Sequence, residues 1–240
     1  MLFSLTRVIM TAILSNLQAV HAAIHLAATM AQRDPAQISL LAVSKTVPAN
    51  VVREAYRAGQ KAFGENYVQE ALNKMQELQD LPLEWHFIGP IQSNKTRAIA
   101  ENFSWVHSVD RLKIAERLSE QRPANLPPLN ICLQINISGE ASKGGMAPDE
   151  AMALTHAVAV LPRLQLRGLM AIPAPAEDLA AQRAPFTAMR ELLARLNSTG
   201  LNLDTLSMGM SHDMTAAILE GSTIVRVGTA IFGSRVYMEK

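Results

Sequence analysis

Residues 205–231 read TLSMGMSHDMTAAILEGSTIVRVGTAI, and this stretch contains one complete strand–helix–strand unit. Two runs that alternate apolar with small residues, 205–211 and 224–231, flank a helical pattern over 213–220 that Gly221 ends. One helix between two strands predicts that the strands lie side by side and run parallel.

The same unit recurs along the rest of the chain. Six more strands are predicted at 40–45, 61–66, 84–89, 105–110, 130–137 and 166–173. Helical patterns fill the gaps at 51–58, 67–78, 94–101, 111–120, 148–160 and 183–197. The eight strands begin about 26 residues apart on average, which suits one strand and one crossover helix per step.

We therefore predict an α/β fold, a (β/α)8 barrel of the TIM type in a single domain; 240 residues suit such a barrel. An open doubly wound sheet is disfavoured because the first turn has no glycine-rich segment. Few residues follow the eighth strand, so a helix around 10–31 is expected to cover the place of the last outer helix. Residues 1–9 are interpreted as an optional extension from an upstream start codon, and 10–240 as the barrel domain.

Composition narrows the possible functions. The net charge of +1, without a basic run, argues against binding nucleic acid or an anionic membrane surface. No unbroken apolar span reaches the roughly 18 residues of a membrane helix. One cysteine, Cys132, excludes an internal disulfide and is typical of the cytoplasm. His21 and His25 have a zinc-compatible spacing but no accompanying carboxylate or Cys, so no metal site is predicted.

Side-chain alternation predicts which residues face the barrel interior. In the strand 130–137 (NICLQINI), the even positions from Cys132 to Asn136 are expected to point inward. Trp85 and Trp105 are expected to face the helices as core residues. Similar reasoning turns a set of polar side chains inward near one end: Lys45, Asn66, His86, Ser211 and Arg226. Such a cluster predicts a polar site, because barrel sites lie at the C-terminal ends of strands.

The residue types in this cluster suit a phosphate-bearing aldehyde. Lys45 ends an apolar strand, where partial burial favours a neutral amine that can attack a carbonyl, although a lysine reaching solvent is the competing interpretation. Ser211, Gly228 and Thr229 offer a hydroxyl and backbone N–H groups for a phosphate, unless the glycines only permit tight packing. A phosphate-bearing aldehyde held by a lysine describes pyridoxal 5′-phosphate (PLP).

Six blocks, in order, carry a resemblance that spans about Met10 to Arg235: LLAVSKTVP (40–48), FGENYVQEA (63–71), EWHFIGPIQSNK (84–95), RGLMAIP (167–173), LSMGMSHDM (206–214) and STIVRVGTAIFGSR (222–235). They resemble the PLP-binding homeostasis protein family, whose fold is similar to the N-terminal barrel of alanine racemase. His212 stands where a small or acidic residue is expected, which would alter the charge of the phosphate loop.

The resemblance implies a role for each predicted site residue. Lys45 would form a Schiff base with PLP. Ser211, Gly228 and Thr229 would hold the phosphate, and Arg226 would face the pyridine nitrogen. Two further residues would line the cofactor ring: Asn66 and His86.

The function implied is PLP homeostasis, meaning that the protein binds and buffers PLP and hands it to apo PLP-dependent enzymes as partners. Arg226 can only donate a hydrogen bond, so it would meet an unprotonated pyridine nitrogen and leave PLP a poor electron sink. Racemases of this fold carry a second, β-rich domain that this chain is expected to lack. Substantial turnover is therefore not expected; the alternative is a PLP-dependent amino-acid racemase. Lys143, in the loop after the fifth strand, is interpreted either as a PLP-guiding amine or as a solvated lysine.

Overall fold

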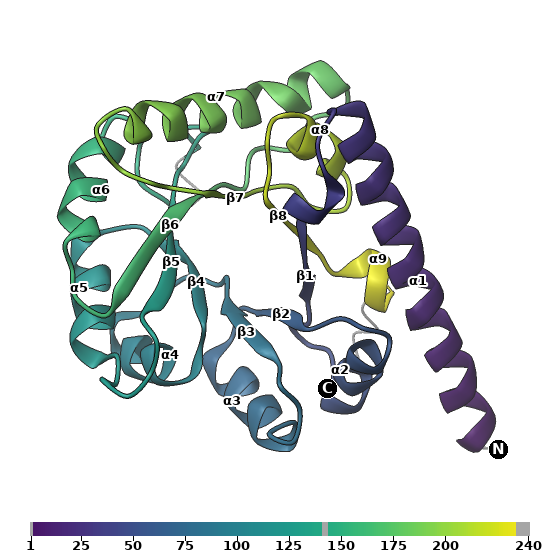
Figure 1. Ribbon diagram of the computed structural model, residues 1–240. Coiled ribbons are helices and arrows are strands. Elements are labelled where there is room, and N and C mark those ends of the chain that lie inside the picture. Colours follow the sequence, from purple (N-terminus) through teal and green to yellow (C-terminus); the bar gives the residue numbers. More distant parts are fainter. Residues whose placement is uncertain (1, 141–143, 234–240) are drawn as a thin grey trace.

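The computed structural model describes residues 2–140 and 144–233 and confirms the predicted barrel (Figure 1). Its eight parallel strands, in the order in which they close the barrel, are β1 (Ser39–Val43), β2 (Ala62–Glu65), β3 (Glu84–Phe87), β4 (Trp105–Val109), β5 (Leu129–Gln134), β6 (Leu164–Met170), β7 (Thr205–Ser207) and β8 (Ile224–Val227). The last strand pairs with the first, with Ala42 beside Val227. This closure excludes the open doubly wound sheet.

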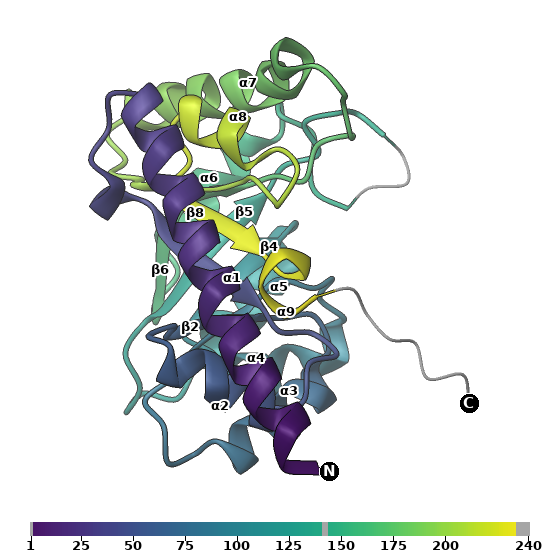
Figure 2. The same ribbon diagram turned by 90° about the vertical axis from the view of Figure 1, so that its right-hand side faces the viewer.

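Helices surround the barrel on its outer side (Figures 1 and 2). They are α1 (Leu2–Met30), α2 (Ala49–Arg57), α3 (Val68–Glu77), α4 (Thr96–Asn102), α5 (Leu112–Gln121), α6 (Ala151–Ala159), α7 (Leu179–Asn197), α8 (Met214–Leu219) and α9 (Thr229–Phe232), with short 3₁₀ turns at Pro35–Gln37 and Ser93–Lys95. None of these helices is long and apolar enough to cross a membrane, within the described residues.

The N-terminal helix α1 occupies the place of the outer helix that would follow β8, as predicted. It packs against α8, α9 and α2, and both views show it beside α8 and α9 (Figures 1 and 2). Its buried side chains recur every three or four residues, which is the spacing of one helix face: Ile13, Leu17, Val20 and Ile24. A hydrogen bond also connects α1 to α9: Asn16 Nδ2 donates to Ile231 O at 2.9 Å.

The helix begins at Leu2 rather than near residue 10, so residues 2–9 continue it without a break. That these residues are an optional extension stays a prediction. Just beyond the C-terminal end of α1, Arg33 Nη1 donates to the carbonyl oxygens of Ile218 and Ser222 at 3.0 and 2.8 Å. Ile218 lies in the last turn of α8 and Ser222 follows that helix, so these two bonds connect the chain after α1 to the C-terminal end of α8.

All eight strands end earlier than predicted, and β7 and β8 are shortened most. β7 stops at Ser207 instead of residue 211, and Gly209, with a φ of +95°, then turns the chain. A Cβ at Gly209 would lie 2.6 Å from Ala217 Cβ, so glycine also lets this turn approach α8 closely. β8 stops at Val227 instead of residue 231 and is followed directly by α9. Alternation of apolar and small residues continues through these turns, which is why the pattern overestimates the strands.

An apolar cluster inside the barrel takes buried side chains from five strands, and it is separate from the larger core between sheet and helices. The buried members of this apolar cluster are Leu41, Trp105, Cys132, Met170 and Ile224. The inward position of Cys132 is as predicted, whereas the prediction that Trp105 faces the helices is wrong. A register shift between Val106 and Val109 breaks the alternation along β4, so counting through it assigns Trp105 to the wrong face.

Candidate active site

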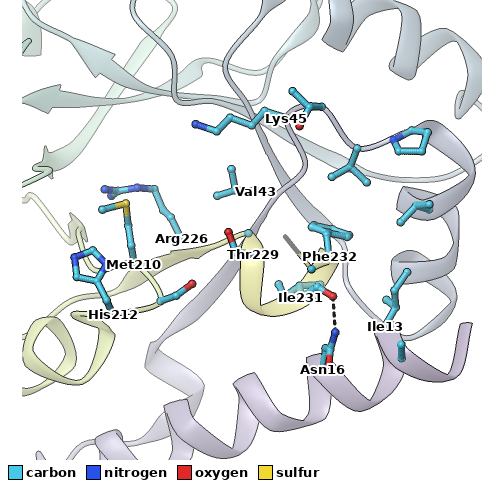
Figure 3. A pocket seen from close by; sticks show the side chains of 18 of the residues that line it. Ile13, Asn16, Val43, Lys45, Met210, His212, Arg226, Thr229, Ile231 and Phe232 are labelled. Carbon is cyan, nitrogen blue, oxygen red and sulfur yellow. Dashed lines mark hydrogen bonds between the residues drawn. The ribbon is translucent and has the colours of Figure 1, made fainter. Parts of the chain in front are cut away.

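A cavity of about 870 Å³ opens at the C-terminal ends of β1 and β8, beside α1 (Figure 3). Its wall comes from β1, β8, the segments that follow β1, β2, β7 and β8, and residues of α1. Five of the seven predicted site residues line it: Lys45, Ser211, Arg226, Gly228 and Thr229. They meet because each lies at or just beyond the end of a parallel strand, and these ends share one side of the barrel.

Lys45 stands two residues after β1 and is half-buried. Figure 3 shows its side chain and that of Arg226 extending to the same side of the cavity. The next residue, Thr46, has a φ of +64°, a left-handed conformation that is rare for a β-branched residue. The Thr46 backbone N–H donates to Glu70 Oε1 at 2.6 Å, which stabilises this turn. Strained backbone of this kind often accompanies functional groups.

An ionic cluster of Glu65, Glu70 and Lys74 lies beside Lys45, where it hydrogen-bonds to both neighbouring residues, Ser44 and Thr46. Glu65 Oε1 accepts hydrogen bonds from Ser44 Oγ and from Lys74 Nζ, both at 2.6 Å. Lys74 Nζ also donates to Glu70 Oε1 at 2.9 Å and to Ser44 O at 2.7 Å. Burial raises the pKa of Glu65, although the charge of Lys74 opposes the rise. The cluster holds the backbone on both sides of Lys45 and thereby fixes where its amine can reach.

Sequence reasoning missed this cluster. Glu70 and Lys74 are four residues apart on α3, a spacing typical of exposed helix pairs, and nothing in the local sequence marks Lys74 as buried. The one signal is Glu65, a carboxylate at the end of an apolar strand, which needs a partner when it is buried.

Arg226 brings a buried positive charge to the cavity. Its Nη1 donates to Ser207 O at 2.5 Å and to Ser207 Oγ at 2.9 Å, and its Nη2 donates to Ala171 O at 3.0 Å. All three acceptors are neutral, and no carboxylate of the described residues hydrogen-bonds to the guanidinium. Burial lowers the pKa of Arg226 to about 10, against the opposing charge of Asp213, so the group stays protonated at neutral pH.

The cavity wall is therefore electropositive. Lys45 and Arg226 both line it, whereas no Asp or Glu of the described residues does. Such a wall favours an anionic ligand, because a buried cation that has only neutral partners gains most from a negative charge nearby.

Gly228 and Thr229 lie where β8 ends and α9 begins. A Cβ at Gly228 would lie 3.1 Å from Val43 O, so the glycine permits a close approach of β1 and β8. Backbone N–H groups in the first turn of a helix have no intrahelical acceptor, which leaves the N–H of Thr229 available. Ser211, between β7 and α8, adds a hydroxyl to the same cavity.

The other two predicted residues lie elsewhere. Asn66 follows β2, and its buried Oδ1 has no hydrogen-bond partner within the described part of the chain. His86 lies inside the barrel, where its Nδ1 is 2.9 Å from His107 Nε2 and its Nε2 is 2.7 Å from Glu84 Oε1. Both of its ring nitrogens are thus occupied by protein groups. Lys143 lies outside the described residues.

Comparisons with known proteins show the family of this chain. Residues 15–236 match the model of the alanine racemase N-terminal domain. A pyridoxal phosphate homeostasis protein of Pseudomonas aeruginosa is 66% identical over 228 residues, which cover 95% of this chain and 98% of that protein. The protein of the same name from Escherichia coli K12 is 55% identical over 234 residues, covering 96% and 100% of the two chains.

Solved structures extend the comparison. PipY of Synechococcus elongatus with PLP bound has a TM-score of 0.81 and 40% identity, covering 92% of this chain and all of that chain. Alanine racemase of Corynebacterium glutamicum, at 21% identity and a TM-score of 0.67, shares the fold over 63% of its own length. The family resemblance carried by the six sequence blocks is confirmed, and the chain belongs to the pyridoxal phosphate homeostasis protein family.

Proposed function

We propose that this chain binds PLP in the electropositive cavity and keeps it available for transfer, with little turnover of amino acids. The observation that carries the proposal is that the Lys45 side chain and the buried Arg226 side chain line the same cavity, whose wall contains no Asp or Glu of the described residues. When bound, PLP supplies an aldehyde that reacts with amines and a phosphate that needs hydrogen-bond donors. The donor set of the cavity fits both groups.

Each residue has a distinct task in this proposal. Lys45 supplies the amine that carries the cofactor, and the ionic cluster beside it limits where that amine can reach. Ser211, Gly228 and Thr229 donate to the phosphate. Arg226 faces the ring nitrogen, and because it only donates, the nitrogen stays unprotonated and the ring withdraws electrons weakly.

Relatives support the same assignment. The Pseudomonas and Escherichia proteins are named for PLP homeostasis, and PipY was solved with PLP bound. We infer that this chain likewise buffers PLP and passes it to apo PLP-dependent enzymes. We propose that this exchange takes place in the cytoplasm, because reducing conditions there keep a free thiol such as Cys132 reduced.

The first test is spectroscopic. Protein purified or reconstituted with PLP is expected to be yellow, and borohydride is expected to fix a pyridoxyl group on the peptide that contains Ser44-Lys45-Thr46, as located by mass spectrometry. Lys45→Ala removes that adduct, whereas Lys113→Met, at an exposed lysine outside the cavity, leaves it in place. A protein that cannot be loaded with PLP, or an adduct on another lysine, contradicts the proposal.

The phosphate contacts are tested with two ligands. Ser211→Ala and Thr229→Val each remove a side-chain hydroxyl and keep the backbone N–H groups, and each is expected to weaken PLP binding by about 10–150-fold, the cost of a lost hydroxyl hydrogen bond to a charged group of about 1.5–3 kcal/mol. Pyridoxal, which has no phosphate, is expected to bind the variants as it binds the parent protein. Equal losses for both ligands would place the phosphate elsewhere.

Turnover is tested on the same preparation. Transfer of PLP to an apo-enzyme is expected to be measurable, and deuterium incorporation at Cα of alanine and serine in heavy water is expected to be negligible. Rapid Cα exchange, at the roughly 1–1000 s⁻¹ of ordinary enzymes, would favour the alternative function of an amino-acid racemase.

A further inference from the structure

A chain of hydrogen bonds crosses the interior of the barrel, and we name its five members the axial chain. Arg226 Nη1 donates to Ser207 Oγ at 2.9 Å, beside the cavity. Ser207 Oγ lies 2.7 Å from His107 Nδ1, and His107 Nε2 lies 2.9 Å from His86 Nδ1. His86 Nε2 lies 2.7 Å from Glu84 Oε1, in a carboxylate that is half exposed at the opposite end of the barrel.

The two ends of the axial chain and the single hydrogen of the Ser207 hydroxyl together fix the direction of every bond in it. A guanidinium can only donate, and an ionised carboxylate can only accept. Ser207 Oγ accepts from Arg226 Nη1, which cannot accept in return, and the other hydrogen-bond partner of this buried hydroxyl within the described residues is His107 Nδ1. Its O–H therefore donates to His107 Nδ1, because a buried hydroxyl hydrogen is rarely left without an acceptor. The hydrogen on His107 Nε2 then goes to His86 Nδ1, and the hydrogen on His86 Nε2 goes to Glu84. Both imidazoles are thereby neutral and carry their hydrogen on Nε2.

The surroundings agree with two neutral rings. Burial lowers the pKa of His86 and lowers that of His107 further, while the bond from His86 lowers the pKa of Glu84 and keeps it ionised. Trp105 stacks on His86 with ring centroids 5.4 Å apart and ring planes within 3° of parallel. Besides the two histidines themselves, the charged groups that act on the two rings are Glu84 on β3 and Arg226 on β8; the Arg167 guanidinium on β6 lies 4.9 Å from the centre of the Trp105 ring.

The hydrogen bond to His107 sets the orientation of the Ser207 hydroxyl toward Arg226. A serine hydroxyl has one hydrogen, and if it pointed at the guanidinium two donors would face each other. The lone pair of His107 Nδ1 draws that hydrogen away, so an oxygen lone pair faces Arg226 Nη1. The three bonds of Arg226 to Ser207 and Ala171 use three of its five N–H donors, leaving two for a ligand.

We propose that His107 is a positioning residue for the binding site: through Ser207 it holds the Arg226 guanidinium as a fixed donor toward the cavity, and His86 and Glu84 set its tautomer. The inference rests on the proposed function only in taking the ring nitrogen of PLP as the group that Arg226 meets. None of the three residues His107, His86 and Glu84 lines the cavity.

The arrangement itself is tested without any cofactor. Nitrogen-15 NMR of the histidine side chains in PLP-free protein is expected to show His86 and His107 neutral, with hydrogen on Nε2, from pH 6 to pH 8. The variants His86→Gln and His107→Gln assign the two signals. A hydrogen on Nδ1 of either ring, or a charged ring at pH 7, overturns the proposal whether or not the protein binds PLP.

The positioning role is tested with a pair of ligands, PLP and an analogue that has a C–H in place of the ring nitrogen. His107→Leu is expected to weaken PLP binding about tenfold, the effect of one impaired hydrogen bond, and to leave the affinity for the analogue unchanged. His107→Gln, whose amide oxygen can accept from Ser207, is expected to recover most of the affinity for PLP. Cys132→Ala, another buried change in the barrel interior, is the matched control and is expected to bind both ligands normally.

The outcomes separate the two proposals. Equal weakening of both ligands by His107→Leu means that His107 only supports the fold, which overturns the positioning role while PLP binding stands. No weakening of PLP binding overturns it as well. If the parent protein binds neither ligand, the proposed function fails, and the histidine tautomers still decide the arrangement of the axial chain.

Discussion

Replacing Lys74 with methionine is expected to destabilise the protein strongly. The Lys74 side chain is 5% exposed, and its Nζ lies 2.6 Å from Glu65, whose side chain has no exposure. Methionine fills a similar volume but leaves the Glu65 carboxylate buried without the cation that hydrogen-bonds it. Losing one partner of a buried ion pair costs about 3–5 kcal/mol. For a chain of this size that lowers the melting temperature by about 6–20 °C.

The loss is expected to depend on pH in a defined direction. Burial already holds the pKa of Glu65 above its ordinary value, and removing Lys74 raises it further because the opposing charge is gone. The folded variant therefore keeps a proton over a wider range above the pKa of the unfolded chain, about 4.3, and its stability falls as pH rises through that range. The difference between the variant and the parent protein is accordingly larger at pH 7.5 than at pH 5.

Urea unfolding followed by circular dichroism, on PLP-free protein at both pH values, measures this difference. The double variant Glu65→Gln/Lys74→Met removes the buried charge and is expected to regain most of the loss. Lys113→Met, at an exposed lysine, is the control and is expected to change the free energy of unfolding by less than about 0.5 kcal/mol. An equal loss at both pH values, or no recovery in the double variant, would refute the reasoning.

Three further changes probe other parts of the structure. Burial raises the pKa of Cys132 to about 12, so its thiolate fraction at pH 8 is about a thousandfold lower than for an ordinary thiol of pKa 9.0. A chromogenic disulfide reagent is expected to detect this thiol only after unfolding, and rapid labelling of folded protein contradicts the expectation. A Cβ at Gly168 would lie 1.9 Å from Thr205 O, so Gly168→Ala is expected to lower the free energy of unfolding by more than about 2 kcal/mol or to prevent folding. Gly200 is the control: it has a φ of +96° and open space around it, and Gly200→Ala is expected to cost about 1 kcal/mol. Leu17→Ala, at a residue 2% exposed on α1, is expected to cost about 2–5 kcal/mol in urea unfolding, and a loss below 1 kcal/mol would mean that α1 contributes little to the core.

The barrel could be predicted from the sequence because its signal is repeated eight times, so that an error in one segment changes little. The ends of single strands have no such repeated signal. The pattern over 205–211 continues past Ser207 into a turn, since small and apolar residues suit a turn beside α8 as well as a strand. The face on which Trp105 lies depends on a register shift in the pairing of β4 with β5. The residues of β4 alone do not predict that shift, because it also depends on the partner strand.

Only part of the candidate site could be predicted from the sequence. Alternation along a strand gives the face on which a side chain lies but not its height along the barrel axis. Lys45 lies beyond the end of β1 and reaches the cavity, whereas His86 is the third residue of β3 and lies deeper in the barrel. His107 and Lys74 owe their roles to partners from other elements, on β3, β7 and the end of β2.

The closure of the barrel has a consequence for how the protein is made. β1 pairs with β8, and 185 residues separate Ser39 from its partner Ile224. At roughly 5–20 residues per second, the ribosome needs about 10–40 s to deliver that partner. Throughout this interval the open edge of β1 presents unpaired backbone groups, and such edges attract other strands. Nascent chains therefore pass through a period of aggregation risk that ends only when the last strand emerges, and chaperones that shield an early strand edge have their main opportunity then.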